Sequence, residues 1–256
     1  MTDRFVRVQT SAKTCYGLLE LNQSVQVLTQ APWRGGIASG EMIAPESYTL
    51  LPPCEPSKIV AIGGNYADHV QEMGAEVPSE PVLFLKPPSA LLPPDGEIAI
   101  PQQSQRVDYE GELALVIGKT ATKITLETAM QYIWGYTIAN DVTARDLQKH
   151  DMQWTRSKSF DTFCPLGPWI VREISPSALL QTHLCRQNSK KTVQSATIDC
   201  MIFSPEVLVT YISQVMTLLP GDVILTGTPA GIGQMVAGDR IIVEIEGIGK
   251  LQNIVG

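Results

Sequence analysis

The chain contains few of several residue types. Aromatic residues make up 6% of its 256 residues, histidine occurs three times, and Lys and Arg do not cluster in runs. With a formal net charge of −7, such a chain is not expected to bind nucleic acid, whose phosphates attract clustered Lys and Arg. With so few rings, the core has to be built mainly from Val, Ile and Leu.

Cysteine is also sparse, and it is arranged without a pattern. The five cysteines are scattered, odd in number and form no C-x-x-C pair, which is typical of reduced thiols rather than of a disulfide framework. No apolar run approaches the roughly 18 residues of a membrane span, and residues 1–30 lack the apolar segment of a signal peptide. We therefore expect a cytoplasmic protein with no membrane partner.

Short apolar runs bounded by Gly, Pro and Asn predict a mixed, β-dominated α+β fold. A small β-rich N-terminal domain is expected over residues 1–55, because the proline-rich joint 51–56 cannot continue a helix or a central strand. Residues 56–256 are expected to form a second, larger domain. Its helices are expected to begin at Asn65 and to span 126–133, 143–151 and 205–218.

Two carboxylates lie two residues apart at the head of a strand-like run, 113–117. Because strand side chains alternate between faces, Glu110 and Glu112 point the same way and repel each other unless a cation lies between them. Asp141 ends another strand-like run. Three carboxylates without nearby Cys or His favour Mg²⁺, Mn²⁺ or Ca²⁺. The residues alone equally allow an exposed edge-strand pair and a helix-capping Asp141.

His69 and Glu72 are spaced i, i+3 on the helix expected after Asn65, so their side chains can meet. A carboxylate that orients an imidazole is the arrangement of a general base, although an exposed helical pair shows the same spacing. His150 and His183 are expected at the surface. Lys158, taken alone, reads as a solvated loop residue.

Taken together, six segments resemble the fumarylacetoacetate hydrolase family, in particular its short acylpyruvase and oxaloacetate decarboxylase-like members. They occur in the family's order over roughly residues 56–250. The segments are 64–69 (GNYADH), 80–87 (EPVLFLKP), 109–113 (YEGEL), 140–148 (NDVTARDLQ), 158–162 (KSFDT) and 225–233 (LTGTPAGIG).

The resemblance implies a β-sandwich roll with flanking helices, usually assembled as a homodimer, and a role for ten residues. Glu110, Glu112 and Asp141 would hold Mg²⁺ or Mn²⁺. His69 and Glu72 would activate water, and Lys158 would offset charge on an enolate. The residues implied to contact a small 2-oxo acid substrate are Tyr66, Arg145, Gln148 and Thr228.

The sequence departs from the family pattern at the turn 184–191 (LCRQNSKK) and at Gly64, where many relatives have a larger residue. The expected function is cleavage of a C–C bond in a 2-oxo acid through a metal-stabilised pyruvate enolate, by acylpyruvate hydrolysis or oxaloacetate decarboxylation. The alternatives are an oxaloacetate tautomerase, a hydroxy-diene-dioate isomerase and, as a different class, a metal-binding protein without catalysis.

Overall fold

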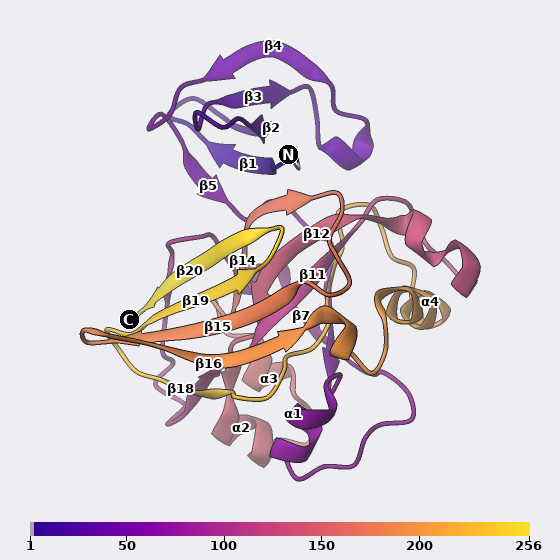
Figure 1. The fold of residues 1–256 in the computed structure, drawn as a ribbon, viewed down its shortest axis with the longest axis vertical. Coiled ribbons are helices and arrows are strands. Elements are labelled where there is room, and N and C mark those ends of the chain that lie inside the picture. The colour runs from indigo at the N-terminus through magenta and orange to yellow at the C-terminus, as the bar shows by residue number, and fades with distance from the viewer. Residues whose placement is uncertain (1–2) are drawn as a thin grey trace.

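A computed structural model describes residues 3–256 and consists of a small all-β module above a larger β-rich body (Figure 1). The module folds because short runs of alternating apolar residues pair as antiparallel strands and bury Val6, Val8 and Val25 between them. Its strands are β1 (Phe5–Gln9), β2 (Thr14–Leu19), β3 (Val25–Leu28), β4 (Ala38–Ile43) and β5 (Thr49–Leu51).

The body is built around a sheet in the order β14-β12-β11-β17-β6-β7. Its strands are β6 (Ile59–Gly63), β7 (Val82–Lys86), β11 (Gly111–Ile117), β12 (Ile133–Asn140), β14 (Cys164–Val171) and β17 (Val223–Leu225). A second sheet, in the order β16-β15-β19-β20-β9, faces it. That sheet contains β9 (Glu97–Ile98), β15 (Leu179–Arg186), β16 (Ser189–Thr197), β19 (Arg240–Ile245) and β20 (Gly249–Val255).

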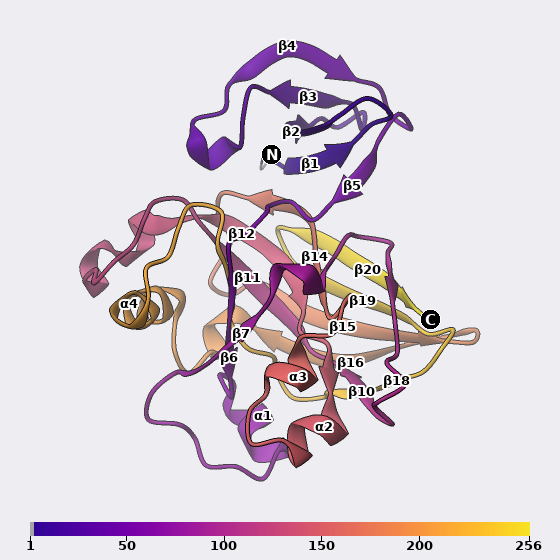
Figure 2. The ribbon, with the colours of Figure 1, turned by 180° about the vertical axis from the view of Figure 1, so that it is seen from behind.

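Short elements complete the body, and three of its helices gather at the end away from the N-terminal module (Figure 2). The remaining strands are β8 (Leu91–Leu92), β10 (Val107–Tyr109), β13 (Thr143–Ala144) and β18 (Gly233–Met235). The α-helices are α1 (Ala67–Glu72), α2 (Arg145–His150), α3 (Thr155–Lys158) and α4 (Pro205–Val215). The 3₁₀ helices of the body are η2 (Pro88–Ala90), η3 (Leu126–Tyr132) and η4 (Ile198–Cys200), and the N-terminal module contains η1 (Pro32–Arg34) between β3 and β4.

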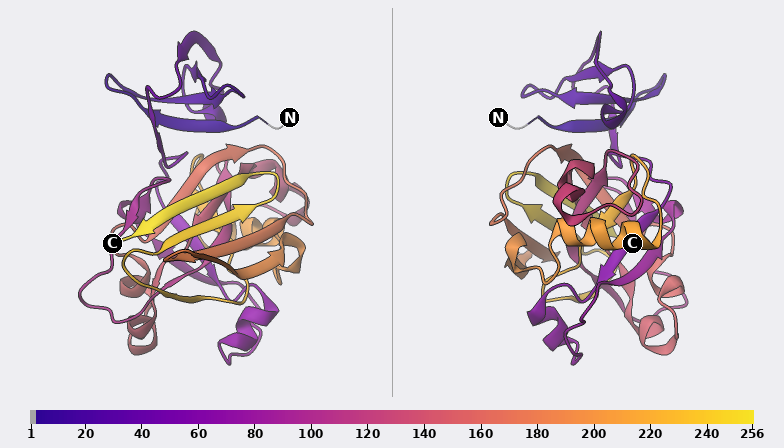
Figure 3. Two further views of the ribbon diagram at one scale, coloured as in Figure 1. Left: turned by 60° about the vertical axis from the view of Figure 1, so that its left-hand side comes forward. Right: turned by 90° about the vertical axis from the view of Figure 1, so that its right-hand side faces the viewer.

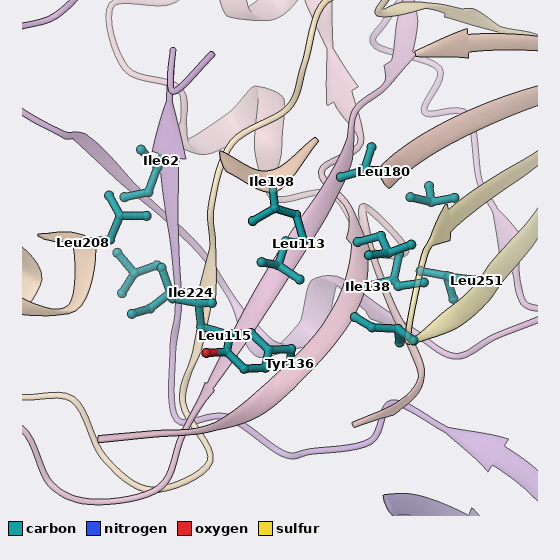
Figure 4. Close-up of a cluster of buried hydrophobic side chains, with 14 of the residues drawn as sticks. Ile62, Leu113, Leu115, Tyr136, Ile138, Leu180, Ile198, Leu208, Ile224 and Leu251 are labelled. Atoms are coloured by element: carbon teal, nitrogen blue, oxygen red, sulfur yellow. The ribbon is translucent and has the colours of Figure 1, made fainter. Parts of the chain in front are cut away.

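Strand β11 separates two cores, because its alternate residues point to opposite faces. Leu113 and Leu115 belong to the large core between the two sheets, where Ile138 also lies (Figure 4). Ala114 and Val116 belong to a second, smaller core on the opposite face of the sheet. All four side chains are fully buried, so a polar residue at any of these positions would have to be buried without water.

The N-terminal module joins the body through one edge of the central sheet. Strand β1 pairs with β14 at Phe5 and Ile170, and the Phe5 ring packs edge-on against Trp134, with centroids 4.8 Å apart. The Trp33 ring also packs edge-on against Trp134, with centroids 5.7 Å apart. The two parts stay distinct in side view, connected by strand pairing and by the chain after β5 (Figure 3).

The predicted β-dominated fold class is confirmed, with corrections to its four helices. The helix expected over 205–218 ends at Val215. The segment 126–133 forms a 3₁₀ helix, η3. The helix expected over 143–151 begins only at Arg145, because residues 143–144 form strand β13. The helix expected from Asn65 starts at Ala67, since the Asn65 side chain bonds the backbone of Phe203 and Thr226 instead.

One histidine prediction was wrong. His183 on β15 is 6% exposed, and its Nδ1 lies 3.0 Å from the Thr192 hydroxyl, whereas His150 is exposed as expected. The turn 184–191, which departs from the family pattern, still closes the β15–β16 hairpin, with Gln187 in the left-handed region at φ 54°. Within residues 3–256, no helix is both long and apolar enough to span a membrane.

Candidate active site

The three candidate metal ligands meet because β11 and β12 are neighbours. Gly111 pairs with Asn140, and the Asp141 N–H donates to the Glu110 carbonyl at 2.8 Å. Each of Glu110, Glu112 and Asp141 is buried, and oxygen atoms of the three carboxylates lie within 4.8 Å of one another. Three buried anions at this spacing repel strongly, so the fold is stable only if cations lie among them.

Three buried cations surround the carboxylates. The Lys158 ammonium donates to Glu110 at 2.8 Å and to Asp141 at 2.6 Å. Lys86 donates to the other oxygen of Asp141 at 2.5 Å, and the Arg145 guanidinium bonds the other oxygen of Glu110. Lys158 is therefore not the solvated loop residue that its segment alone indicates, because it ends α3 and is 2% exposed.

Ionisation differs between the two glutamates. Although burial opposes the charged form of Glu110, Lys158 and Arg145 hold the pKa of its carboxyl well below the usual value. Burial raises the pKa of Glu112, and the charges of Asp141 and Glu110 raise it further. Its only hydrogen-bond donor among the described residues is the Gly227 N–H, at 2.7 Å. Glu112 is thus the ligand that most needs a further positive charge.

A divalent ion fits this donor set. The three ligands are hard oxygen anions, as Mg²⁺ and Mn²⁺ prefer. Within residues 3–256, the four buried carboxylates Asp108, Glu110, Glu112 and Asp141 are balanced by Lys86, Arg145, Lys158 and the partly exposed Arg106. A divalent cation would therefore give the site a net positive charge that attracts an anionic substrate.

The histidine and its partner lie on α1. His69 Nδ1 is 3.1 Å from Glu72 Oε2, and Glu72 accepts from the Gly231 N–H at 3.1 and 3.2 Å. A Cβ at Gly231 would lie 1.9 Å from a backbone carbonyl oxygen, and φ is +103°, so the turn needs glycine here. The glycine-rich turn 227–233 thus holds the carboxylate that orients the imidazole.

These groups open on one cavity of about 280 Å³. Seven of the ten predicted site residues contribute to its lining, and an eighth contacts a lining residue from α1. The lining includes His69, Glu110, Glu112, Arg145, Gln148, Lys158 and Thr228, and Glu72 supports it through His69.

Two predicted residues lie behind the cavity wall. Asp141 is covered by Lys86 and Lys158 and does not line the cavity. Tyr66, predicted to contact substrate, does not line it either; its buried hydroxyl has no hydrogen-bond partner among the described residues, and burial raises its pKa.

Sequence reasoning missed two charged residues of the site. Lys86 lies within the segment 80–87, and Asp108 immediately precedes the segment 109–113. Asp108 accepts from Arg145 Nε at 3.0 Å and from Arg106, so it positions the guanidinium that bonds Glu110. A lysine inside a short apolar strand is the one signal that points to Lys86, because a buried ammonium needs an anionic partner.

Comparison with known proteins identifies the family of this chain. The family model described as fumarylacetoacetate hydrolase C-terminal matches residues 58–256. The chain belongs to the fumarylacetoacetate hydrolase family. A second model, described as Rv2993c-like, N-terminal, matches residues 3–53.

Relatives within the family carry several activities in their names. The mitochondrial oxaloacetate tautomerase FAHD2A of Bos taurus is 40% identical, over 95% of this chain and 80% of its own length. A 5-carboxymethyl-2-hydroxymuconate delta-isomerase from Mycobacterium smegmatis has a TM-score of 0.91 at 39% identity, covering 98% of both chains. A fumarylpyruvate hydrolase from Pseudomonas aeruginosa, in complex with Mn²⁺ and pyruvate, has a TM-score of 0.73 at 33% identity, covering 81% of this chain and 91% of that one.

Proposed function

We propose that this protein cleaves a C–C bond in 2-oxo acids that carry a second carbonyl group, releasing pyruvate, with Mg²⁺ or Mn²⁺ held by Glu110, Glu112 and Asp141. The observation that carries the proposal is that His69, oriented by Glu72, lines the same cavity as Glu110, Glu112 and Lys158. The Mn²⁺ and pyruvate in the related fumarylpyruvate hydrolase support both the metal and the product.

His69 supplies the base for hydrolysis. Its Nδ1 faces Glu72, which leaves Nε2 for the cavity. Nε2 takes a proton from water, whose oxygen attacks the carbonyl group remote from the carboxylate. The bond between that carbon and the next then breaks, and its electron pair forms the enolate of pyruvate. The imidazolium returns the proton to the enolate carbon, giving a carboxylic acid and pyruvate. Decarboxylation of oxaloacetate forms the same enolate without attack by water.

The remaining residues hold the substrate and its charge. Arg145 Nη1 bonds the Gln148 amide oxygen at 2.5 Å, so the two side chains form one polar wall of the cavity for the substrate's carboxylate and oxo groups. The Thr228 hydroxyl is fixed by the Gly111 carbonyl and the Gln194 amide. When bound, the divalent ion supplies Lewis-acid stabilisation of negative charge on the 2-oxo oxygen, and the Lys158 ammonium adds to it.

Pyruvate release from acetylpyruvate and from oxaloacetate, with Mg²⁺ or Mn²⁺ and then with chelator, tests the proposal. We expect metal-dependent pyruvate, and we expect His69→Ala to lower hydrolysis by about 10²–10⁴-fold while affecting decarboxylation less. Gln71→Ala, an exposed change on the same helix, is the matched control. Equal losses in both reactions would contradict water activation by His69, and no pyruvate from either substrate would refute the function.

A second candidate function is keto–enol tautomerisation of oxaloacetate. The name of the Bos taurus relative, matched over 95% of this chain, favours it, and proton exchange by His69 beside a stabilised enolate would suffice. Rapid loss of the enol absorbance of oxaloacetate without pyruvate would select this function over cleavage.

We further propose that the protein forms a homodimer, as the family resemblance implies. Light scattering coupled to size-exclusion chromatography tests this directly. A mass of about 28 kDa, that of the single chain, would refute it.

A further inference from the structure

The cavity changes character along its length. At its polar end Lys158 contacts Glu110 and Asp141, and its ammonium also lies 5.0 Å from the centroid of the Phe84 ring. That ring packs edge-on against Trp154, with centroids 5.3 Å apart. The wall therefore passes directly from the charged cluster to an aromatic surface.

Beyond Trp154 the lining is small and apolar. Gly63 pairs with Val82 across β6 and β7, and a Cβ at Gly63 would lie 2.6 Å from the Trp154 ring. The indole thus lies against bare backbone, and any larger residue at Gly63 would displace it. A Cβ at Gly64 would lie 3.4 Å from the Val70 side chain and 4.0 Å from the Pro78 side chain. Both Val70 and Pro78 line the cavity.

The charges of the lining are distributed unevenly. Its basic side chains, within residues 3–256, are His69, Arg145 and Lys158, and all three already have carboxylate partners. Besides Glu110 and Glu112, the one further acidic residue of the lining within residues 3–256 is Glu76, on the exposed loop after α1. A carboxylate at the apolar end would lose water and gain no cation, and the Glu76 charge in the same lining would repel it, which costs free energy.

We infer that the substrate class is acylpyruvates with a short, uncharged alkyl tail, rather than diacids with a terminal carboxylate; this rests on the cleavage activity proposed above. The 2-oxo acid end lies at the carboxylate cluster. The alkyl tail extends along Phe84 and Trp154 toward Val82. Trp154 is the principal specificity-determining residue, and Glu76 disfavours an anionic tail.

Matched substrates test the inference. Butyrylpyruvate and succinylpyruvate differ only in a terminal methyl or carboxylate group, and acetylpyruvate lacks the last two carbons. We expect kcat/KM to rise about fourfold for each methylene buried and to be higher for butyrylpyruvate than for succinylpyruvate. Pyruvate from all three with succinylpyruvate preferred or equal would overturn the inference and leave the cleavage activity standing. Pyruvate from none of them would instead refute the proposed function.

Two variants sharpen the test, because a ratio between substrates does not depend on how much protein is folded. Trp154→Ala should lower kcat/KM for butyrylpyruvate more than for acetylpyruvate. Glu76→Gln should raise kcat/KM for succinylpyruvate about two- to fivefold without changing that for butyrylpyruvate, whereas Glu46→Gln, exposed in the N-terminal module, should change neither. Unchanged ratios in both variants would contradict the assignment and direct attention to the adjacent hollow lined by Arg106 and Lys149.

Discussion

Replacement of Lys86 by Met removes one buried cation and keeps the length of the side chain. The Lys86 ammonium is fully buried and bonds Asp141 at 2.5 Å and the Val142 carbonyl at 3.3 Å. Removal of one partner of a buried ion pair costs about 3–5 kcal/mol. Asp141 keeps its hydrogen bond from Lys158 at 2.6 Å. We therefore expect the free energy of unfolding to fall by the lower limit of this range, about 3 kcal/mol.

Thermal unfolding in the presence of chelator measures this loss. At about 2–4 °C per kcal/mol for a chain of this size, Lys86→Met should lower Tm by roughly 6–12 °C. Saturating Mn²⁺ should then raise Tm more in the variant than in the wild type, because the ion takes over the neutralisation of Asp141. Lys119→Met, an exposed substitution, is the control. If the two variants unfold within about 2 °C of each other, the charge accounting at this site is wrong.

Three further predictions follow from single contacts. Glu110→Gln should abolish metal-dependent turnover and lower metal content, and full activity with intact metal would contradict its assignment as a ligand. Gly231→Ala should lower kcat with little change in metal affinity, because the displaced turn releases Glu72; an unchanged kcat would refute that positioning role. Asp239 is buried, which opposes its ionisation, yet the Arg186 guanidinium holds the pKa of its carboxyl below the usual value. Its contribution to stability is therefore present above the unfolded pKa of about 3.9 and is lost as pH falls through the lower folded value. Asp239→Asn should accordingly unfold at a lower denaturant concentration than the wild type at neutral pH, with the difference vanishing in acid; a difference that is constant with pH would refute this linkage.

The parts of the site that follow from local pattern were predictable. The continuous apolar run 113–117 indicates a buried strand, and helical spacing brings His69 to Glu72. The full site depends on residues distant in sequence. Lys86 and Asp141 are 55 residues apart, and their contact exists only once β7 and β12 occupy one sheet. No local pattern encodes that contact, so sequence reasoning alone does not assign Lys86 to the site.

The errors have the same physical origin. His183 reads as a surface residue because its neighbours in the chain are polar, but strands β16 and β19 pack on both sides of β15 and cover it. Residues 143–144 continue a helical pattern in sequence, yet the pairing of Asp108 with Thr143 makes them a strand. In each case backbone pairing with a remote segment outweighs local preference.

Strand pairing between β1 and β14 has a consequence for the isolated body of the protein. Without the N-terminal module, the backbone of β14 near Ile170 would become a free strand edge, and the Trp134 ring would lose the packing of Phe5 and Trp33. An uncovered edge beside an apolar surface recruits strands from other molecules. The module therefore shields the body against aggregation, independently of any part it takes in catalysis.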